Sequence, residues 1–217
     1  NFIDLQINGS IMVGGNFATI GGVAARNLAM LNDNGSVTTT FQPRPDGVVN
    51  ALLALPDGRT IVGGAFSNIA GAARNRLARI NADGGLDATY NANATGAVRA
   101  IALQSDGRVL VGGTGIVRLN ANGSPDASLT ANVSGTVTSL AVQADGKILY
   151  ATNQSALARL NADGSADLSF STAAGGVSAI TLQADGRIVV GGAPARLLRL
   201  NPNGSVDASI NVASDAD

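Results

Sequence analysis

The charged side chains of this sequence recur at matched positions, and they are the residues whose chemistry needs explaining first. Two basic sets and one acidic set are present: Arg79, Arg118, Arg159 and Arg199; Arg59, Arg108, Lys147 and Arg187; and Asp87, Asp126, Asp167 and Asp207. Guanidinium and carboxylate groups form strong, planar pairs. Because a binding site usually breaks the symmetry of a repeated scaffold, we expect structural pairs, in which each arginine bonds an aspartate or turn carbonyls between repeats.

A second pattern gathers side-chain oxygens around tight turns. It reads Asn-x-Asp-Gly-x-x-Asp at residues 81–87 and again at 161–167. Calcium takes six to eight oxygen ligands, so this pattern would need backbone carbonyls and water to complete the shell. The alternative is that Asn and Asp bond the amides of their own turns. We predict no cofactor, and keep calcium at these turns as an alternative.

The residue inventory argues against catalysis. The 217 residues include no His and no Cys, and all fifteen acidic residues are Asp. A Ser-His-Asp or Cys-His arrangement and a His-ligated zinc site are therefore excluded, and no phosphate-binding Walker pattern occurs. A hydrolase that uses paired Asp residues is the chemistry left open. We predict a protein that is not an enzyme, and assign no catalytic, cofactor-binding or metal-ligating residues.

These charges sit within a block of about 40 residues that the chain repeats five times. Each copy carries two Asn-Gly or Asp-Gly turns, which are strong hairpin signals between apolar runs. The first turns begin at Asn8, Asp57, Asp106, Asp145 and Asp185, and the second at Asn34, Asp83, Asn122, Asp163 and Asn203. In the third copy we predict strands at 98–103, 108–111, 116–120 and 126–129. Repeats of this size indicate a solenoid, a propeller or an array.

The apolar pattern favours a β-propeller. Runs such as Ile61-Val62 and Ile188-Val189-Val190 are apolar at consecutive positions, which predicts strands with both faces buried, as in stacked blades. We predict an all-β fold, a propeller of five four-stranded antiparallel blades in one domain over residues 1–217. The approximate blades are 1–47, 48–96, 97–135, 136–175 and 176–217, with 211–217 as an inter-blade connector. Part of a larger propeller, a β-solenoid and a sandwich are alternatives.

The first two copies contain an additional segment at residues 16–26 and 65–74. Phe17 and Phe66 occupy matched places in the two segments, and we also match Arg26 with Arg74. Each segment is expected to be a loop that its Phe pins at one end of the propeller. A ligand-binding rim is the alternative.

The repeat resembles the delta-60 repeat family of β-propeller proteins. The resemblance is fullest over residues 62–87, which read Val-Gly-Gly-x-Phe, a Gly/Ala loop, then Arg-Asn-x-Leu-Ala-Arg-Ile-Asn-Ala-Asp-Gly-x-Leu-Asp. Its second half recurs at 97–113, 137–150 and 177–192. The resemblance implies a propeller in a large secreted or surface-exposed bacterial protein, and it provides no catalytic residues to transfer. Copies three to five depart from it by lacking the Phe-containing loop.

The composition limits which kinds of partner the chain is expected to bind. The net charge is −1 and 13% of residues are charged, about half the ordinary share. Such a surface favours association and gives nucleic acid no basic face. No apolar run is long enough to span a membrane. The missing initiator Met suggests a chain that is processed, excised or truncated.

Two functions follow as hypotheses. The first is a non-enzymatic structural module of a secreted or cell-surface protein, which self-associates into an extracellular assembly or filament. The alternative is a recognition or adhesion module that holds a protein or glycan on the face carrying loops 16–26 and 65–74. The chain has no Trp, two Tyr and five Phe, and this scarcity of aromatic rings disfavours a glycan.

Overall fold

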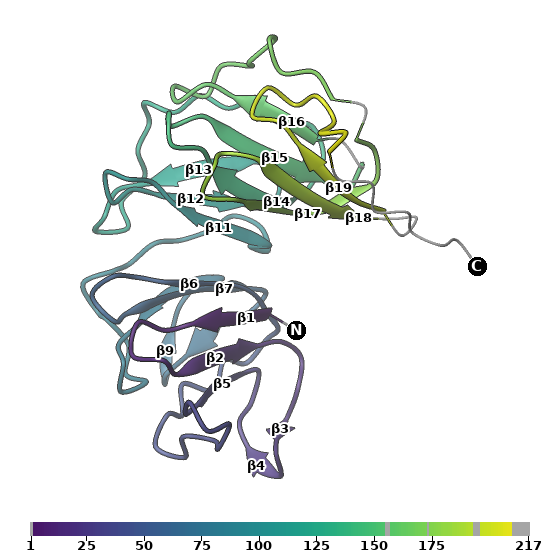
Figure 1. Cartoon of the computed structure of the whole chain (residues 1–217). Coiled ribbons are helices and arrows are strands. Elements are labelled where there is room, and N and C mark those ends of the chain that lie inside the picture. Colours follow the sequence, from purple (N-terminus) through teal and green to yellow (C-terminus); the bar gives the residue numbers. More distant parts are fainter. Residues whose placement is uncertain (1, 155–156, 173, 193–195, 210–217) are drawn as a thin grey trace. The chain divides into compact units, whose positions relative to one another are not determined.

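A computed structural model describes residues 2–154, 157–172, 174–192 and 196–209 (Figure 1). The predicted connector at 211–217 lies outside the described residues. The described chain is built of β-strands and turns, without helices, so no helix in it is long and apolar enough for a membrane span. The chain forms two compact units, Asn1–Ile101 with Leu119–Pro125, and Ala102–Arg118 with Asp126–Asp217.

The first unit contains two three-stranded antiparallel sheets and two short hairpins. One sheet has the order β1 (Phe2–Leu5), β2 (Ile11–Gly14), β5 (Leu28–Leu31), and the other β10 (Leu77–Ile80), β7 (Thr60–Gly64), β6 (Val49–Ala54). The hairpins are β3 (Thr19–Ile20) with β4 (Val23–Ala24), and β8 (Asn68–Ile69) with β9 (Ala72–Ala73). The loops predicted at 16–26 and 65–74 therefore fold as small hairpins.

The second unit contains two further sheets of the same kind. They have the orders β14 (Val137–Val142), β15 (Ile148–Thr152), β16 (Leu157–Leu160), and β17 (Val177–Leu182), β18 (Ile188–Gly192), β19 (Arg196–Leu200). A fifth sheet comprises β11 (Ala100–Leu103), β12 (Val109–Gly112) and β13 (Ile116–Leu119), and its residues are divided between the two units. The predicted strands of the third copy agree with these bounds to within two residues, except for the fourth.

The prediction of four strands per repeat is wrong. After its second turn each described repeat returns to the sheet through a single bridge, as Leu119 does with Pro125. In repeats two to five an aspartate follows, and its side chain accepts the N–H of the residue two further on; Asp126 Oδ1 accepts the N–H of Ser128 at 2.9 Å. The first repeat has Thr38 at this place and also forms only a single bridge, between Leu31 and Val37, so three-stranded sheets occur with and without this side-chain hydrogen bond.

Neighbouring sheets within a unit meet through a glycine. A Cβ added to Gly14 on β2 would collide with Val49 and touch Leu52, both on β6 of the next repeat. Gly63 meets Val98 and Ile101 in the same way. In the second unit Gly112 meets Val137 and Leu140. Both faces of β7 and β12 are buried by this packing, as the unbroken apolar runs predicted, whereas β18 keeps half-buried residues at Val189, Gly191 and Gly192.

Candidate functional site

The repeated charges form ion pairs within repeats and reach into the next repeat, as predicted. Arg79 donates from Nε to Asp87 Oδ2 at 2.8 Å, and from Nη1 to the carbonyl of Ala121 in the following second turn at 2.8 Å. In the second unit the same bonds join Arg118 with Asp126 and Ala162, and Arg159 with Asp167 and Pro202; Arg199 pairs with Asp207. The guanidinium of Arg79 also lies 4.6 Å from the ring centre of buried Tyr90.

The second basic set adds a further cation to each of these carboxylates. Arg59 and Asp87 pair at 2.5 Å, and Lys147 donates to Asp167 at 2.9 Å. The hydroxyl and then the N–H of Ser128, followed by Arg118, lower the pKa of Asp126 to about 2. Burial acts to raise the pKa of Asp87, but bonds from Thr89, Arg79 and Arg59 outweigh it and hold the pKa well below its usual range. These aspartates therefore stay ionised and paired, which suits a structural role.

The stability of the fold is expected to fall in acid, because it depends on these ionised aspartates. The pKa values of Asp126 and Asp207 lie at about 2 against an ordinary 3.8, and the hydroxyl of Ser209 is the first cause for Asp207. A depressed folded-state pKa stabilises the fold fully above the unfolded value and loses that contribution as the pH falls through the folded one. We expect the free energy of unfolding to hold from pH 7 to about 4.5, then to fall toward pH 2. Guanidinium titrations at stepwise pH measure this, and a curve that stays flat to pH 2 contradicts the pairing.

The turns proposed as a calcium alternative use their oxygens locally. Asp83 Oδ1 accepts the N–H of Gly85 at 2.8 Å, and Asp163 Oδ1 accepts both the N–H and the hydroxyl of Ser165. The turn-amide interpretation is confirmed at these two residues. Among the described residues no three carboxylates, imidazoles or thiols gather as a metal site would need.

Chelation tests the calcium alternative directly. Because the turn oxygens already accept hydrogen bonds from their own turns, we expect the melting temperature with excess EDTA to match that with added calcium. Calorimetric scans at constant ionic strength measure it. A rise in melting temperature that grows with calcium concentration would show binding to the folded state.

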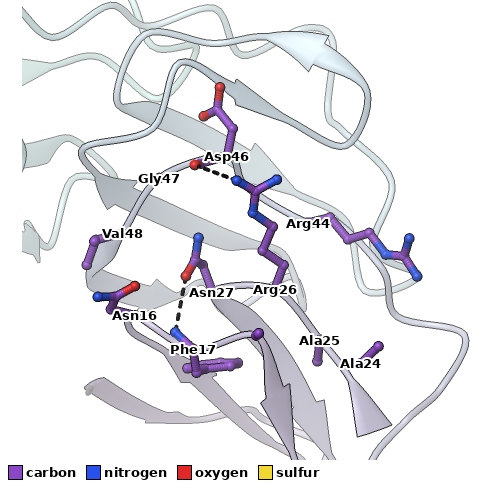
Figure 2. A pocket seen from close by; sticks show the side chains of 11 residues that line it. Asn16, Phe17, Ala24, Ala25, Arg26, Asn27, Arg44, Asp46, Gly47 and Val48 are labelled. Atoms are coloured by element: carbon purple, nitrogen blue, oxygen red, sulfur yellow. Dashed lines mark hydrogen bonds between the residues drawn. The ribbon is translucent and has the colours of Figure 1, made fainter.

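A concavity in the first unit lies beside the first hairpin. It has a volume of about 770 Å³, and Figure 2 shows its lining side chains, which come from residues 16–18, 24–27, 44 and 46–48. A cleft of about 490 Å³ in the second unit is lined by Arg118 and Arg108, whose charges are already paired with Asp126. The first-unit cleft, called here the hairpin cleft, is therefore the candidate binding site.

Hydrogen bonds from the turn at 44–48 fix the walls of the hairpin cleft. Buried Asn27 accepts the N–H of Phe17 through Oδ1 and donates to the carbonyl of Pro45 at 3.1 Å. Arg26 donates from Nη2 to the carbonyl of Asp46 at 3.1 Å (Figure 2). Both Arg26 and Arg44 are exposed. The cleft thus presents two guanidinium groups beside an apolar floor.

The one carboxylate of the hairpin cleft is already satisfied. Asp46 accepts four hydrogen bonds, from the backbone and side chains of Ser67 and Asn68, at 2.7–2.9 Å. The amide side chain of Asn68 is the first cause that holds the pKa of Asp46 well below its usual range. Asp46 therefore ties the second hairpin to the cleft wall, and it is a poor proton acceptor for catalysis.

The match predicted between Arg26 and Arg74 is wrong by one residue. The structure aligns Phe17 with Phe66, because these carbonyls accept the N–H of Asn27 and of Arg76. Both donors have positive φ, 60° and 67°. Arg26 is thus the counterpart of Asn75, and it belongs to the first hairpin alone. The error arose because the second segment is one residue shorter between its Phe and its first arginine.

Phe66 pins its hairpin, with 1% of its surface exposed, whereas Phe17 is half-buried at the hairpin cleft. Sequence reasoning placed residues 16–26 at a possible rim but missed Arg44 and Asp46. The available signal was Asp46-Gly47, an Asp-Gly dipeptide that belongs to neither repeated set of turns.

Comparison with known sequences identifies the repeat. A β-propeller family described as a domain of unknown function (DUF5122) matches residues 6–41, 55–90, 104–129, 143–170 and 183–209. These segments cover more than half of the chain and include both turns of every repeat. No curated protein sequence matches the chain.

Solved structures share the fold at low identity. A Bacteroides caccae protein of unknown function has 16% identity and a TM-score of 0.62, over 91% of this chain and 76% of its own. Virginiamycin B lyase from Staphylococcus aureus has 18% identity and a TM-score of 0.62, and the match covers 93% of this chain and 70% of the lyase chain. The Pan2 WD40 domain of Neurospora crassa has 16% identity and a TM-score of 0.66, and the match covers 94% of this chain and 63% of the Pan2 chain. At such identity the likeness concerns the fold alone, so the prediction that this chain is not an enzyme stays a prediction. The all-β prediction and its propeller repeat are confirmed, and the chain belongs to the DUF5122 β-propeller family.

Proposed function

We propose that this chain is a non-enzymatic recognition module of a secreted or cell-surface protein, and that its hairpin cleft holds an acidic protein segment. The observation that carries the proposal is the pair of exposed arginines, Arg26 and Arg44, beside a satisfied Asp46. The four hydrogen bonds that Asp46 accepts leave it little capacity to bind a ligand. The charged groups of the cleft that remain for a ligand are therefore the two guanidinium groups. Guanidinium groups bind carboxylates through two parallel hydrogen bonds.

The floor of the hairpin cleft favours a polypeptide over a sugar. It consists of small apolar side chains, Ala18, Ala24, Ala25 and Val48, with Phe17 as the one aromatic ring among the lining residues. Glycan sites usually stack rings on the ligand. An extended segment with one Glu or Asp and small apolar neighbours matches both the floor and the arginines.

Peptide binding tests the proposal. The probe is an array of fluorescent pentapeptides that each carry one Glu among Ala, Val and Leu, followed by anisotropy titration of the best binder. We expect Arg26→Gln to weaken binding about 10- to 100-fold, the effect of losing a hydrogen bond to a charged group. Arg74→Gln makes the same substitution on the second hairpin, at a residue that does not line the hairpin cleft, and this control should bind as the wild type does. Equal binding by both variants, or an array with no preference for Glu over Gln, contradicts the proposal.

A second candidate is the structural module that self-associates. It is favoured by the exposed apolar side chains of the first strand, Phe2, Ile3 and Leu5, together with the net charge of −1. We also propose that the chain is a member of the delta-60 repeat family and that it is extracellular. Sedimentation velocity over a hundredfold range of concentration tests it, and a monomer throughout counts against it.

A further inference from the structure

Four of the turns share the tripeptide Asn-Gly-Ser, and they begin at Asn8, Asn34, Asn122 and Asn203. An asparagine before a glycine is chemically labile, because glycine has no side chain to hinder attack of its backbone nitrogen on the neighbouring side-chain amide. In each of these turns the asparagine Oδ1 accepts both the N–H and the hydroxyl of the serine. Since the sites share one tripeptide and one set of hydrogen bonds, differences in their reactivity must come from the packing around each turn.

The turn at Asn8 is the first turn of its repeat, and the first turns are open. Asn8 and Gly9 are exposed, and no described atom lies within 4 Å of a Cβ added to Gly9. The same holds for Gly58 and Gly107 in the second and third repeats. The openness therefore belongs to this place in the repeat, and it does not depend on where the sequence begins.

The Asn-Gly-Ser turns of the third and fifth repeats are second turns, and they are packed. Their asparagines are exposed as well, but their glycines are buried. A Cβ added to Gly123 would lie 3.1 Å from the ring of Tyr90, which is itself fully buried. A Cβ added to Gly204 would lie 2.8 Å from the ring of Phe170.

This packing bears on the reaction because the native turn must open before the glycine nitrogen can attack. In each turn the glycine N–H donates to the carbonyl three residues before it, at 2.8–3.0 Å. An open hairpin tip can leave this conformation by local fluctuation, whereas a packed turn must displace an aromatic ring. Asn34 lies in a second turn with no repeat before it in this sequence, so the proposal does not extend to it.

We propose that Asn8 is a site of spontaneous deamidation in the folded protein. The backbone nitrogen of Gly9 bonds to Cγ of Asn8, the bond from Cγ to Nδ2 breaks, and ammonia leaves with the proton of the Gly9 N–H. Water then opens the resulting succinimide ring. Opening at Cγ gives aspartate, and opening at the main-chain carbonyl gives isoaspartate.

The aspartate product fits this turn, because the chain already contains the same tripeptide at residues 163–165. There Asp163 Oδ1 accepts the N–H and the hydroxyl of Ser165 at 2.9 and 2.7 Å, as Asn8 Oδ1 accepts those of Ser10. The other four repeats also have Asp at the start of their first turn. Aspartate therefore keeps the hairpin between β1 and β2 and adds one negative charge to the net charge of −1, whereas isoaspartate lengthens the backbone of the turn by a methylene group.

Ageing of the folded protein at neutral pH and body temperature tests the proposal. Tryptic peptides 1–26, 119–147 and 200–217 carry Asn8, Asn122 and Asn203 separately, and mass spectrometry follows each against an unaged sample that is digested in parallel. We expect Asn8 to deamidate about tenfold faster than the two packed sites. In urea concentrated enough to unfold the chain, the three rates should be nearly equal, which controls for the sequence. Asn8→Asp should melt at the temperature of the wild type.

Three outcomes overturn the proposal. A native rate at Asn8 no higher than at Asn122 and Asn203 shows that the open turn does not promote the reaction. A difference in rate that persists in urea shows that flanking sequence, and not packing, selects the site. A clear fall in the melting temperature of Asn8→Asp shows that the turn does not accommodate the product.

Discussion

Replacing Asp87 with alanine is expected to lower the free energy of unfolding by about 3–5 kcal/mol, because it leaves a buried cation without its partner. Arg79 and Asp87 are both buried, and Asp87 also bonds Arg59 and Thr89. Guanidinium or urea unfolding at pH 7 measures the change. The same measurement on Asp57→Asn provides the exposed comparison: its bond to Arg59 lies at the surface, and the expected cost is within about 1 kcal/mol.

The first repeat lacks both members of the ion pair, and it therefore shows which double substitution the fold accepts. Met30 and Thr38 stand there where later repeats have the paired Arg and Asp, so both charges are absent together. We expect Arg79→Met with Asp87→Thr to unfold at a smaller cost than Asp87→Ala alone, because no buried charge is left unpaired. A double variant less stable than the single one would contradict the structural role of the pair.

The second large effect is expected at the glycine contact between repeats. Gly63→Ala should lower the free energy of unfolding by about 1–3 kcal/mol, because the new methyl group must displace Val98 and Ile101 in a packed interface. The measurement is again equilibrium unfolding, with near-ultraviolet circular dichroism to verify the native packing.

Gly191→Ala is the matched control for this overpacking. It has the same place in its repeat and no described atom within 4 Å of the added methyl group, so we expect a change within about 0.5 kcal/mol in dilute monomer. Equal losses in the two variants would mean that the cost arises in the strand itself rather than between repeats.

The repeat made most of the fold predictable from sequence. Ten Asn-Gly or Asp-Gly dipeptides in register predicted the hairpins, and the apolar run Ile61-Val62 indicated a strand buried on both faces, as β7 is. The ion pairs were predictable for the same reason, since Arg79 and Asp87 lie at places where four repeats keep both charges and the first repeat loses both.

Residues outside the repeat were not predictable in this way. The prediction of a fourth strand failed because each repeat rejoins its sheet through one bridge, as Leu119 does with Pro125, and a pattern of apolar residues does not record where pairing ends. The hairpin cleft depends on Asp46, which bonds Ser67 and Asn68 about twenty residues later in the chain. No period relates these residues, so only the folded chain brings them together.

Amide hydrogen exchange with and without the best acidic pentapeptide tests the central claim most directly, namely that repeated charges are structural and that recognition lies where the repeat is broken. The account predicts that saturating peptide slows exchange at residues 16–27 and 44–48 and leaves the repeated turns unchanged. Protection at the turns that carry Asp126, Asp167 and Asp207, with none at the hairpin cleft, would contradict it.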